Sequence, residues 1–379
     1  MKIGVIGAGR LGICFALLCE AAGYEVLVSD IREDYVNDLN QRKINTTEPE
    51  VENLLKIAKN FEATTDNRKV IRECDLLYTL VQTPSLGDGS YDVSAVWQVV
   101  QDIKEEMTTI ANRPKDFVVG CTTNPGDCDL FKKELPFSVR TFYNPEFIAQ
   151  GSIINDLKTA DVVLLGYDST YGSQSNHTIG YIRKLYEKIQ TTKVNLSTMS
   201  NKAAEITKIA LNCYLTTKIS YANMLGEVLI KSDLEDEVDT VLKAIGSDSR
   251  VGNKYLNYGY GYGGPCFPRD NRAFSSHASS VGVQFNVGET TDNINNAHAE
   301  FLKQYFIKKN KDNLPFCFKY LTYKPHTDIF TESQQYRLCL DLLNAGYKVY
   351  CLDDTSSSVL DNRINFIAAP IETVCWIDL

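Results

Sequence analysis

Short apolar runs alternate with amphipathic segments along the first half of the chain. Residues 2–7 form a near-continuous apolar run, the pattern of a buried parallel strand. Residues 11–22 predict a helix that ends at Gly23. Further runs predict strands at 24–29, 75–81, 117–121, 139–143 and 160–166, with a helix near 92–110. This alternation predicts an α/β fold in which helices cover both faces of a parallel sheet.

The pattern changes in the middle of the chain. It is helical from about residue 201 to residue 231, with more helix near 234–244. A smaller unit begins near Asn313, and its predicted elements are a strand at 316–318, a helix at 332–344 and a strand at 348–352. A chain of 379 residues has room for two or three domains. We therefore predict a sheet domain over 1–198, a central helical domain over 199–300 and a short sheet domain over 301–379.

A glycine loop follows the first predicted strand. Gly7-Ala8-Gly9-Arg10-Leu11-Gly12 fits the pattern G-x-G-x-x-G, and Asp30 ends the next strand. The first glycine permits a tight turn, the second lets a pyrophosphate approach the backbone, and the third allows close packing of helix and strand. An aspartate at position 30 accepts hydrogen bonds from a ribose diol and repels a 2′-phosphate, which favours NAD over NADP. The alternative is a glycine turn in an unrelated α/β fold.

A second loop surrounds one cysteine. Residues 258–270 read YGYGYGGPCFPRD, with four glycines before Cys266. We expect this stretch to be neither packed helix nor strand, and to suit close approach of backbone amides to a ligand. A nearby cation such as Arg269, or a helix start, favours the nucleophilic thiolate. The alternative for any cysteine is a small buried hydrophobic residue. That alternative fits four cysteines on predicted helical faces: Cys14, Cys19, Cys213 and Cys339.

The long predicted helix carries a polar stripe. Glu205, Lys208 and Asn212 are spaced i, i+3 and i+7 and therefore share one face. A lysine and an asparagine one turn apart can both donate to one oxygen and form an oxyanion site. The alternative is an ordinary solvated helix face.

Composition and charge exclude several classes. The net charge of −9, from 48 acidic and 39 basic residues, disfavours a general nucleic-acid or anionic-membrane binder. The apolar runs are shorter than the roughly 18 residues that a spanning helix needs, so we expect no membrane segment. The 11 cysteines form no CxxC pair, and the first residues lack the features of a signal peptide, which predicts a cytoplasmic protein with reduced thiols. The four histidines have no zinc-ligand spacing, so we expect no metal.

Six motifs together resemble the UDP-glucose 6-dehydrogenase family, within the wider nucleotide-sugar dehydrogenases. The resemblance extends from residue 1 to about residue 352. The motifs occur in this order: Gly7 to Gly12, Val81-Gln82-Thr83-Pro84, Asn144-Pro145-Glu146-Phe147, Lys208 with Asn212, Gly261 to Asp270, and Tyr323-Lys324-Pro325-His326-Thr327-Asp328.

The resemblance implies two Rossmann-like domains joined by a long helix. Residues 1–198 would bind NAD, residues 199–300 would form a homodimer, and residues 301–379 would bind the UDP-sugar. The implied reaction is the four-electron oxidation of UDP-glucose to UDP-glucuronate with two NAD molecules, through a cysteine thiohemiacetal and thioester. Such a product serves polysaccharide biosynthesis.

The resemblance also implies roles for individual residues. The catalytic positions would be Cys266, Lys208, Asn212, Glu146, Thr122 and Asp270. Cys266 would be the nucleophile, and Lys208 and Asn212 would stabilise the oxyanion. Glu146 would act in acid–base steps and thioester hydrolysis. Thr122 and Asp270 would order water. The cofactor positions would be Gly7, Gly9, Arg10, Leu11, Gly12, Asp30, Thr83, Gln150 and Arg269. The substrate positions would be Phe147, Arg250, Tyr255, Tyr262, Gly263 and Lys324, with Arg250 reaching the neighbouring subunit's site.

Several positions depart from the family pattern. Gln150 stands where a glutamate near the cofactor ribose is usual, and Thr331 replaces an arginine. Arg10 replaces a tyrosine of the glycine loop, and the proline expected after Thr122 is displaced to Pro125. We therefore expect weaker NAD binding than is usual in the family.

Three alternatives stay open. The same chemistry could act on another nucleotide sugar, GDP-mannose or a UDP-N-acetylhexosamine. The chain could be a non-catalytic binding paralogue, or a simple two-electron alcohol dehydrogenase. Cys266, without a histidine base or zinc set, disfavours the last of these.

Overall fold

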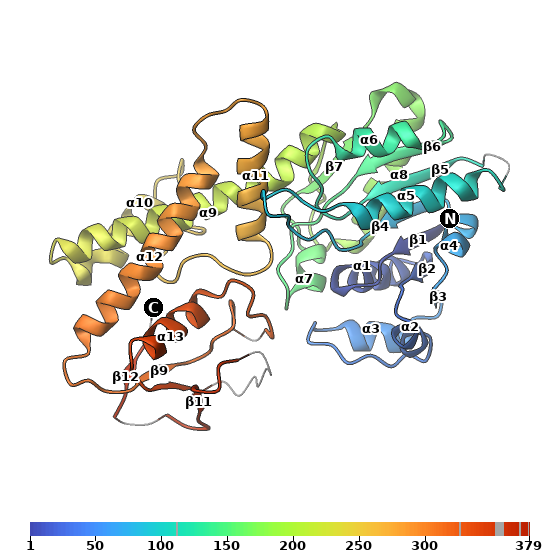
Figure 1. Ribbon diagram of the computed structural model, residues 1–379. Helices are drawn as coiled ribbons and strands as arrows, with labels where there is room; N and C mark the ends of the chain where they lie inside the picture. Colours follow the sequence, from blue (N-terminus) through green and yellow to red (C-terminus); the bar gives the residue numbers. More distant parts are fainter. Residues whose placement is uncertain (111–112, 326, 353–359, 371–372, 378) are drawn as a thin grey trace. The chain divides into compact units, whose positions relative to one another are not determined.

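The computed structural model describes residues 1–110, 113–325, 327–352, 360–370, 373–377 and 379. His326 of the sixth motif lies outside these residues. The chain divides into two compact units, Met1–Lys208 and Ile209–Leu379, which are described in turn (Figure 1). None of the helices within the described residues has the length and apolar character needed to cross a membrane.

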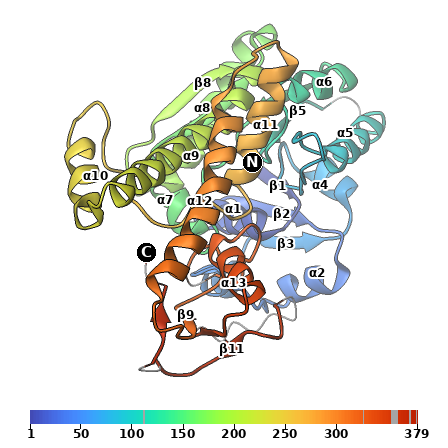
Figure 2. The same ribbon diagram turned by 60° about the vertical axis from the view of Figure 1, so that its left-hand side comes forward.

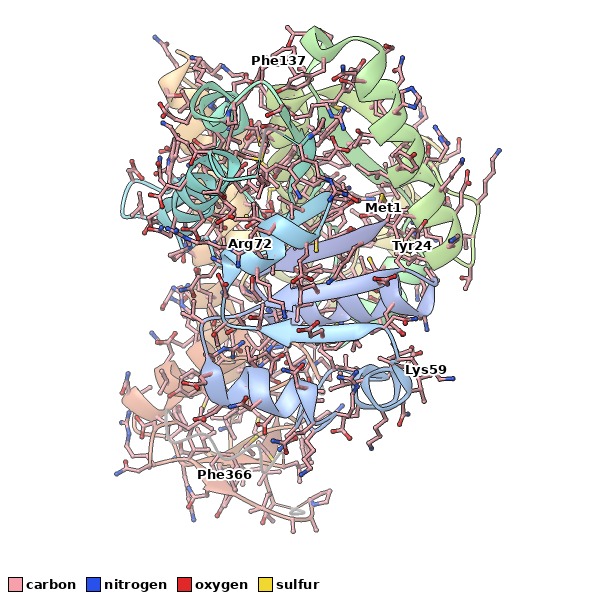
Figure 3. All side chains as sticks on the ribbon, turned by 90° about the vertical axis from the view of Figure 1, so that its right-hand side faces the viewer. Met1, Tyr24, Lys59, Arg72, Phe137 and Phe366 are labelled. Carbon is pink, nitrogen blue, oxygen red and sulfur yellow. The ribbon has the colours of Figure 1, made fainter. Side chains whose placement is uncertain are left out.

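The first unit is built on one sheet of eight strands in the order β3-β2-β1-β4-β5-β6-β7-β8. Its strands are β1 (Lys2–Ile6), β2 (Glu25–Ser29), β3 (Phe61–Thr64), β4 (Leu76–Thr79), β5 (Lys115–Val119), β6 (Val139–Tyr143), β7 (Val163–Tyr167) and β8 (Leu196–Ser200). Neighbouring strands are parallel except for β6 and β7. Figure 3 shows Tyr24 and Lys59, which precede β2 and β3, on the same side of the sheet, where both strands begin. The chain order reverses between β1 and β4, the position where α/β sheets bind ligands at the carboxyl ends of their strands.

Helices cover both faces of this sheet. They are α1 (Arg10–Ala21), α2 (Glu33–Asn40), α3 (Val51–Ile57), α4 (Asn67–Glu73), α5 (Ser94–Met107), α6 (Asp127–Glu134), α7 (Ile153–Lys158) and α8 (Ser173–Ile189), with the short 3-10 turn η1 (Ser169–Tyr171). Helices α1, α2, α3, α7 and α8 share one apolar core, which includes Phe15 and Ile182. Helices α4, α5 and α6 share the core of the other face, which includes Val99 and Phe131. The predicted sheet with helices on both faces is confirmed.

Helix α9 (Asn201–Lys231) runs from the end of the first unit into the second. Its bounds match the predicted helix over 201–231. The other elements of the second unit are the 3-10 turn η2 (Glu235–Glu237), α10 (Val238–Gly246), α11 (Phe267–Ser280), α12 (Val287–Lys309), β9 (Phe316–Phe318), α13 (Gln334–Asn344), β10 (Val349–Cys351), β11 (Asn365–Phe366) and β12 (Cys375–Trp376). Helices α11 and α12 lie side by side (Figure 2).

The strands of the second unit form a parallel sheet in the order β11-β10-β9-β12. Helix α13 covers it through a core that contains Leu338 and Leu342. The predicted smaller strand–helix–strand unit is therefore confirmed. One prediction for this half of the chain is wrong: residues 267–270 are not irregular, because α11 begins at Phe267, directly after Cys266.

Candidate active site

The loops at the carboxyl edge of the first sheet hold most of the predicted cofactor residues. Gly7 follows β1, Asp30 follows β2, Thr83 follows β4, Thr122 follows β5 and Glu146 follows β6. These five strands are mutually parallel, so their carboxyl ends meet at one edge. The structure therefore gathers residues that are up to 139 positions apart in the sequence, from Gly7 to Glu146, along one edge of the sheet.

The three glycines of the first motif have different surroundings. Gly7 has a φ of +97°, and an added Cβ would lie 2.7 Å from the carbonyl oxygen of Leu80. At Gly12 a Cβ would lie 1.9 Å from the carbonyl oxygen of Gly7. The protein itself therefore requires both of these glycines. At Gly9 a Cβ would meet no atom within 4 Å, so this glycine keeps open space next to the N-terminus of α1. That space and that helix end fit the pyrophosphate of a dinucleotide.

Asp30 presents an ionised carboxylate beside the glycine loop. Burial by itself raises the pKa of Asp30, but hydrogen bonds from Arg32 outweigh burial and hold the pKa below its usual value. Arg32 donates from Nε to Oδ1 at 2.8 Å and stacks on the ring of Tyr35. A carboxylate at this place fits a ribose diol and repels a phosphate, as the sequence predicts for NAD.

A loop from residues 46–50 lies against two predicted cofactor positions. Arg10, at the start of α1, donates to Thr47 Oγ1 at 3.4 Å. Glu48 is buried and accepts the backbone N–H of Gly151 at 2.6 Å and that of Ile153 at 3.3 Å. Glu48 therefore holds the turn that carries the half-exposed Gln150. Thr83 is buried just beyond β4, and Leu11 is half-buried in the first turn of α1.

Glu146 is the most perturbed acid at this edge. Burial raises its pKa to about 7, although a hydrogen bond from Tyr186 and the charge of Lys208 both lower it. Tyr186 Oη also lies 2.9 Å from Asn144 Oδ1, which accepts from Tyr78 Oη at 3.0 Å as well. A carboxyl group that titrates near neutral pH can accept and return a proton during turnover.

Lys208 ends the first unit and faces the Glu146 loop. Its Nζ donates to the carbonyl oxygen of Glu146 at 2.8 Å and lies 4.7 Å from the centre of the Phe147 ring. Lys208 is 6% exposed. The predicted substrate residue Phe147 therefore lies beside Lys208, a predicted catalytic residue.

The polar stripe of α9 is buried, so the alternative of a solvated face is wrong. Glu205 is fully buried and accepts Thr123 Oγ1 at 2.9 Å and the backbone N–H groups of Gly126 and Cys128. Burial raises the pKa of Glu205 to about 7 despite these hydrogen bonds. Glu205 thus fixes the loop that carries the half-buried Thr122.

The second unit contains the predicted nucleophile. Cys266 is half-buried and is the N-cap residue of α11, whose first turn offers amide groups to a negative charge. Among the described residues, which include all eleven cysteines, no disulfide forms. Cys14, Cys19, Cys213 and Cys339 are buried as predicted. Of the two features expected to favour the thiolate, a nearby cation or a helix start, the helix start lies directly after Cys266.

A buried polar pair lies one turn beyond this cysteine. Asn212 Nδ2 donates to Asp270 Oδ2 at 2.6 Å, and both side chains are less than a tenth exposed. Asp270 follows Cys266 by four residues in α11, and its N–H donates to the carbonyl oxygen of Cys266 at 2.9 Å. Arg269, which directly precedes Asp270, donates to the carbonyl oxygen of Pro265. Asn212 itself lies one helical turn after Lys208 along α9.

Close packing explains the two glycines nearest Cys266, Gly263 and Gly264. A Cβ at Gly263 would lie 2.3 Å from the carbonyl oxygen of Glu332, and a Cβ at Gly264 would lie 2.4 Å from the ring of Tyr323. These glycines therefore bring the cysteine loop against residues 323–333. The Tyr262 side chain is buried, and its Oη donates to Asp292 Oδ1 at 2.5 Å. That contact points this predicted substrate residue inward.

The remaining predicted substrate residues lie on turns of the second unit. Tyr255 is 42% exposed, has a φ of 64° and packs edge-on against Phe267. Arg250 is exposed and paired with Asp248 at 2.6 Å. The carbonyl oxygen of Lys324 accepts a hydrogen bond from Thr327 Oγ1 at 2.8 Å.

Sequence reasoning assigned no role to two groups that act on these residues. Tyr186 belongs to α8 and carries no local signal of its contact with Glu146, 40 residues away. Asn144 precedes Glu146 in the third of the six motifs, but its contacts with Tyr78 and Tyr186 depend on the sheet. Within the described residues, no cluster of three or more histidine, cysteine or acidic side chains is placed to hold a metal ion.

Comparison with known proteins identifies the family. Residues 1–190 match the NAD binding domain, and residues 202–297 the central domain, of the UDP-glucose/GDP-mannose dehydrogenase family. The chain belongs to this family. It therefore carries the NAD binding domain of nucleotide-sugar dehydrogenases, and the open space at Gly9 and the carboxylate of Asp30 fit that cofactor.

Three individual proteins illustrate what this chain is similar to. The UDP-glucose 6-dehydrogenase AglM of Haloferax volcanii is 28% identical over 379 residues, which cover 96% of this chain and 85% of that protein. An uncharacterized protein of Methanocaldococcus jannaschii is 32% identical over 278 residues, which cover 72% of this chain but only 30% of that protein. The structure of a UDP-glucose dehydrogenase from Pyrobaculum islandicum has a TM-score of 0.84 at 24% identity, and the match covers 97% of this chain and 85% of that one. The last likeness shows the fold.

Proposed function

We propose that this protein oxidises the C6 alcohol of UDP-glucose to the carboxylate of UDP-glucuronate, through intermediates bound to Cys266. The observation that carries the proposal is the thiol at the N-terminus of α11, followed one turn later by the buried Asp270–Asn212 pair. A two-electron alcohol dehydrogenase has no use for such a thiol, whereas a four-electron oxidation needs a nucleophile to hold the aldehyde.

The first oxidation develops charge on the sugar oxygen. NAD, when bound, accepts a hydride from the sugar at each oxidation. Lys208 uses one of its three N–H bonds on the carbonyl oxygen of Glu146, and Asn212 uses one of its two on Asp270. The other N–H bonds of this lysine and amide would donate to the C6 oxygen. A positioned donor of this kind typically changes the rate by a factor of about 10² to 10³.

The covalent step holds the aldehyde. The thiolate of Cys266 would add to the aldehyde carbon, and the oxygen would take up a proton to give a thiohemiacetal. Loss of a second hydride and of that proton leaves a thioester. Water then adds to the thioester carbonyl and expels the thiolate, which gives the carboxylate product.

Glu146 supports the hydrolysis in this scheme. Its pKa of about 7 lets the ionised carboxylate take a proton from water near neutral pH. Glu205 would act by positioning the loop of Thr122, which we propose binds that water. Asp270 would share the ordering of water through its bond to Asn212.

The specific sugar is part of the proposal. The relative from Haloferax volcanii is named a UDP-glucose 6-dehydrogenase, and Phe267-Pro268-Arg269-Asp270 resembles that branch of the family more than the hexosamine branch. The same chemistry on GDP-mannose or on a UDP-N-acetylhexosamine is the second candidate, because the family includes both UDP-glucose and GDP-mannose enzymes. Lys324, Tyr255 and Gly263 are proposed substrate contacts.

A homodimer is also proposed. Tyr214, Tyr221 and Val228 are spaced seven residues apart on α9 and are 59%, 45% and 52% exposed, with Met224 on the same side. An apolar stripe of this kind on one helix fits a second copy of the chain. Arg250, which is exposed, would reach the partner's substrate.

One measurement tests the reaction. With limiting UDP-glucose and excess NAD, we expect two NADH per sugar and an acidic product. A single NADH per sugar would refute the covalent scheme. If UDP-glucose gives none, a panel with GDP-mannose and UDP-N-acetylhexosamines separates another substrate from a binding paralogue, which releases no NADH with any of them.

A further inference from the structure

Three buried side chains hold the backbone just before the nucleophile. They are Asn223 of α9 and Asn295 and His298 of α12, which are 1%, 8% and 1% exposed. All three belong to the second unit, and all contact residues 259–262, which precede Cys266 by four to seven positions. We call these three residues the loop clamp.

The two asparagines each use both ends of their amide group. Asn223 Oδ1 accepts the N–H of Gly259 at 3.0 Å, while its Nδ2 donates to the carbonyl oxygen of Tyr260 at 3.2 Å. Asn295 Oδ1 accepts the N–H of Tyr262 at 2.9 Å, while its Nδ2 donates to the carbonyl oxygen of the same residue at 3.0 Å. The two asparagines thus bond four backbone groups of this segment: the N–H groups of Gly259 and Tyr262 and the carbonyl groups of Tyr260 and Tyr262.

His298 holds a further carbonyl group of this segment, that of Gly259. Its Nε2 lies 2.8 Å from the carbonyl oxygen of Gly259, and its Nδ1 lies 2.7 Å from Glu227 Oε1. A carbonyl oxygen only accepts, so Nε2 carries the hydrogen of this contact. Glu227 lies one turn after Asn223 on α9, and it fixes the ring from the other side.

The backbone is pressed onto both helices at this point. A Cβ at Gly226 would lie 2.1 Å from the ring of Tyr258, and a Cβ at Gly261 would lie 2.2 Å from Asn295 Oδ1. The Tyr258 ring meets His298 edge-on at 5.7 Å. The clamp therefore grips a segment whose path is already restricted on two sides.

We propose that the loop clamp positions Cys266, and that the bond from His298 Nε2 to the carbonyl oxygen of Gly259 is the contact on which the position of the thiol depends. The proposal rests on the proposed function of Cys266 as the nucleophile. Asn223, Asn295 and His298 are positioning residues, because they act through the backbone of residues 259–262. Displacement of a reacting group by about 1 Å can lower a rate by roughly 10²-fold.

Two isosteric variants separate the two bonds of His298. In His298→Gln the amide nitrogen takes the place of Nε2 and can still donate to Gly259. In His298→Asn the amide nitrogen takes the place of Nδ1 and can still bond to Glu227, but the donor to Gly259 is lost. Each variant removes one hydrogen bond, so a purely structural role predicts similar losses of stability and activity in both.

We expect His298→Asn to lower kcat by about 10- to 100-fold, with the KM for NAD within about twofold of the parent. We expect His298→Gln to retain kcat within about threefold. Similar kcat values in the two variants at similar stability would overturn the proposal. Faster hydrogen exchange at residues 257–266 in His298→Asn without a fall in kcat would also overturn it.

A second measurement does not depend on the substrate. In a Cys375→Ser background, Cys266 is the one half-buried cysteine, and the other nine are buried. Its alkylation by iodoacetamide, followed by intact mass, should be at least threefold slower in His298→Asn, because the thiolate loses its fixed place at the N-terminus of α11. His298→Gln should restore the parent rate. Equal alkylation rates in His298→Asn and His298→Gln would overturn the proposal. This test holds even if the parent enzyme makes no NADH, because the absence of NADH would refute only the proposed reaction.

Discussion

The hydroxyl of Tyr186 should set the pH at which Glu146 titrates. Tyr186 is fully buried, and burial raises its own pKa well above its usual value, so the hydroxyl stays protonated and acts as a donor. Its hydrogen bond favours the ionised form of Glu146 and so lowers a pKa that burial has raised from 4.5 to about 7. The variant Tyr186→Phe removes this bond and keeps the ring. The pKa of Glu146 should therefore rise.

The size of the shift follows from the energy of one hydrogen bond. A bond to a charged group contributes about 1.5–3 kcal/mol, and about 1.36 kcal/mol corresponds to one pKa unit. The pKa of Glu146 in Tyr186→Phe should therefore be higher by about 1 to 2 units. For a shift of one unit, the ionised fraction at pH 7 falls from about one half to about one tenth. Since the ionised carboxylate is the proposed base, activity at pH 7 should fall about fivefold and recover near pH 9.

The assay is the pH profile of kcat for NADH formation, measured from pH 5.5 to 9.5. The parent should show a rise with a midpoint near 7, and Glu146→Gln should lose that rise. Tyr78→Phe is the matched control, because Tyr78 Oη also donates to Asn144 Oδ1 but no contact joins it to Glu146 among the hydrogen bonds of the described residues. A midpoint in Tyr186→Phe equal to that of the parent, or an equal shift in Tyr78→Phe, would refute the reasoning.

Three further outcomes are expected. Cys266→Ser should release at most one NADH per sugar, and full conversion to the acid at the parent rate would contradict the covalent scheme. Gly9→Ala should change the free energy of unfolding by less than about 1 kcal/mol but raise the Kd for NAD at least tenfold by calorimetry, whereas Gly12→Ala should cost more than about 2 kcal/mol in chemical denaturation. Tyr221→Glu should convert a dimer to monomers in sedimentation, and Ile57→Glu, at an apolar position that is 70% exposed on α3, should not.

Local pattern was enough to predict the elements whose position depends on near neighbours. The glycine loop, the strand before it and the helix after it follow from spacing, because a Cβ at position 12 would meet a backbone only five residues away. The long helix over 201–231 follows from apolar periodicity without a proline. The small sheet unit near the C-terminus was predicted on the same basis. Short strands such as β3 and β8 were missed, since four or five residues with mixed polarity carry little periodic signal.

The chemistry of the site was decided by contacts that no local pattern records. The residue type at position 146 was visible in the sequence. Its pKa near 7 comes from burial, which is partly offset by the hydrogen bond from Tyr186, 40 residues away. The polar stripe on α9 has a spacing that also fits a solvated face. Only the tertiary structure shows that the stripe is buried and that its first member, Glu205, caps the N-terminus of α6.

The same holds for the cysteine loop. The glycines before Cys266 were predicted to allow close approach of backbone amides to a ligand, and the structure shows that Gly261, Gly263 and Gly264 pack closely against α12 and residues 323–333. Periodicity reports which face of an element is buried, and not what it is buried against. The sequence by itself therefore determined the fold class, the cofactor loop and the candidate nucleophile. The tertiary structure decided which carboxyl groups titrate near neutral pH, because desolvation and hydrogen bonding act between residues that only folding brings together.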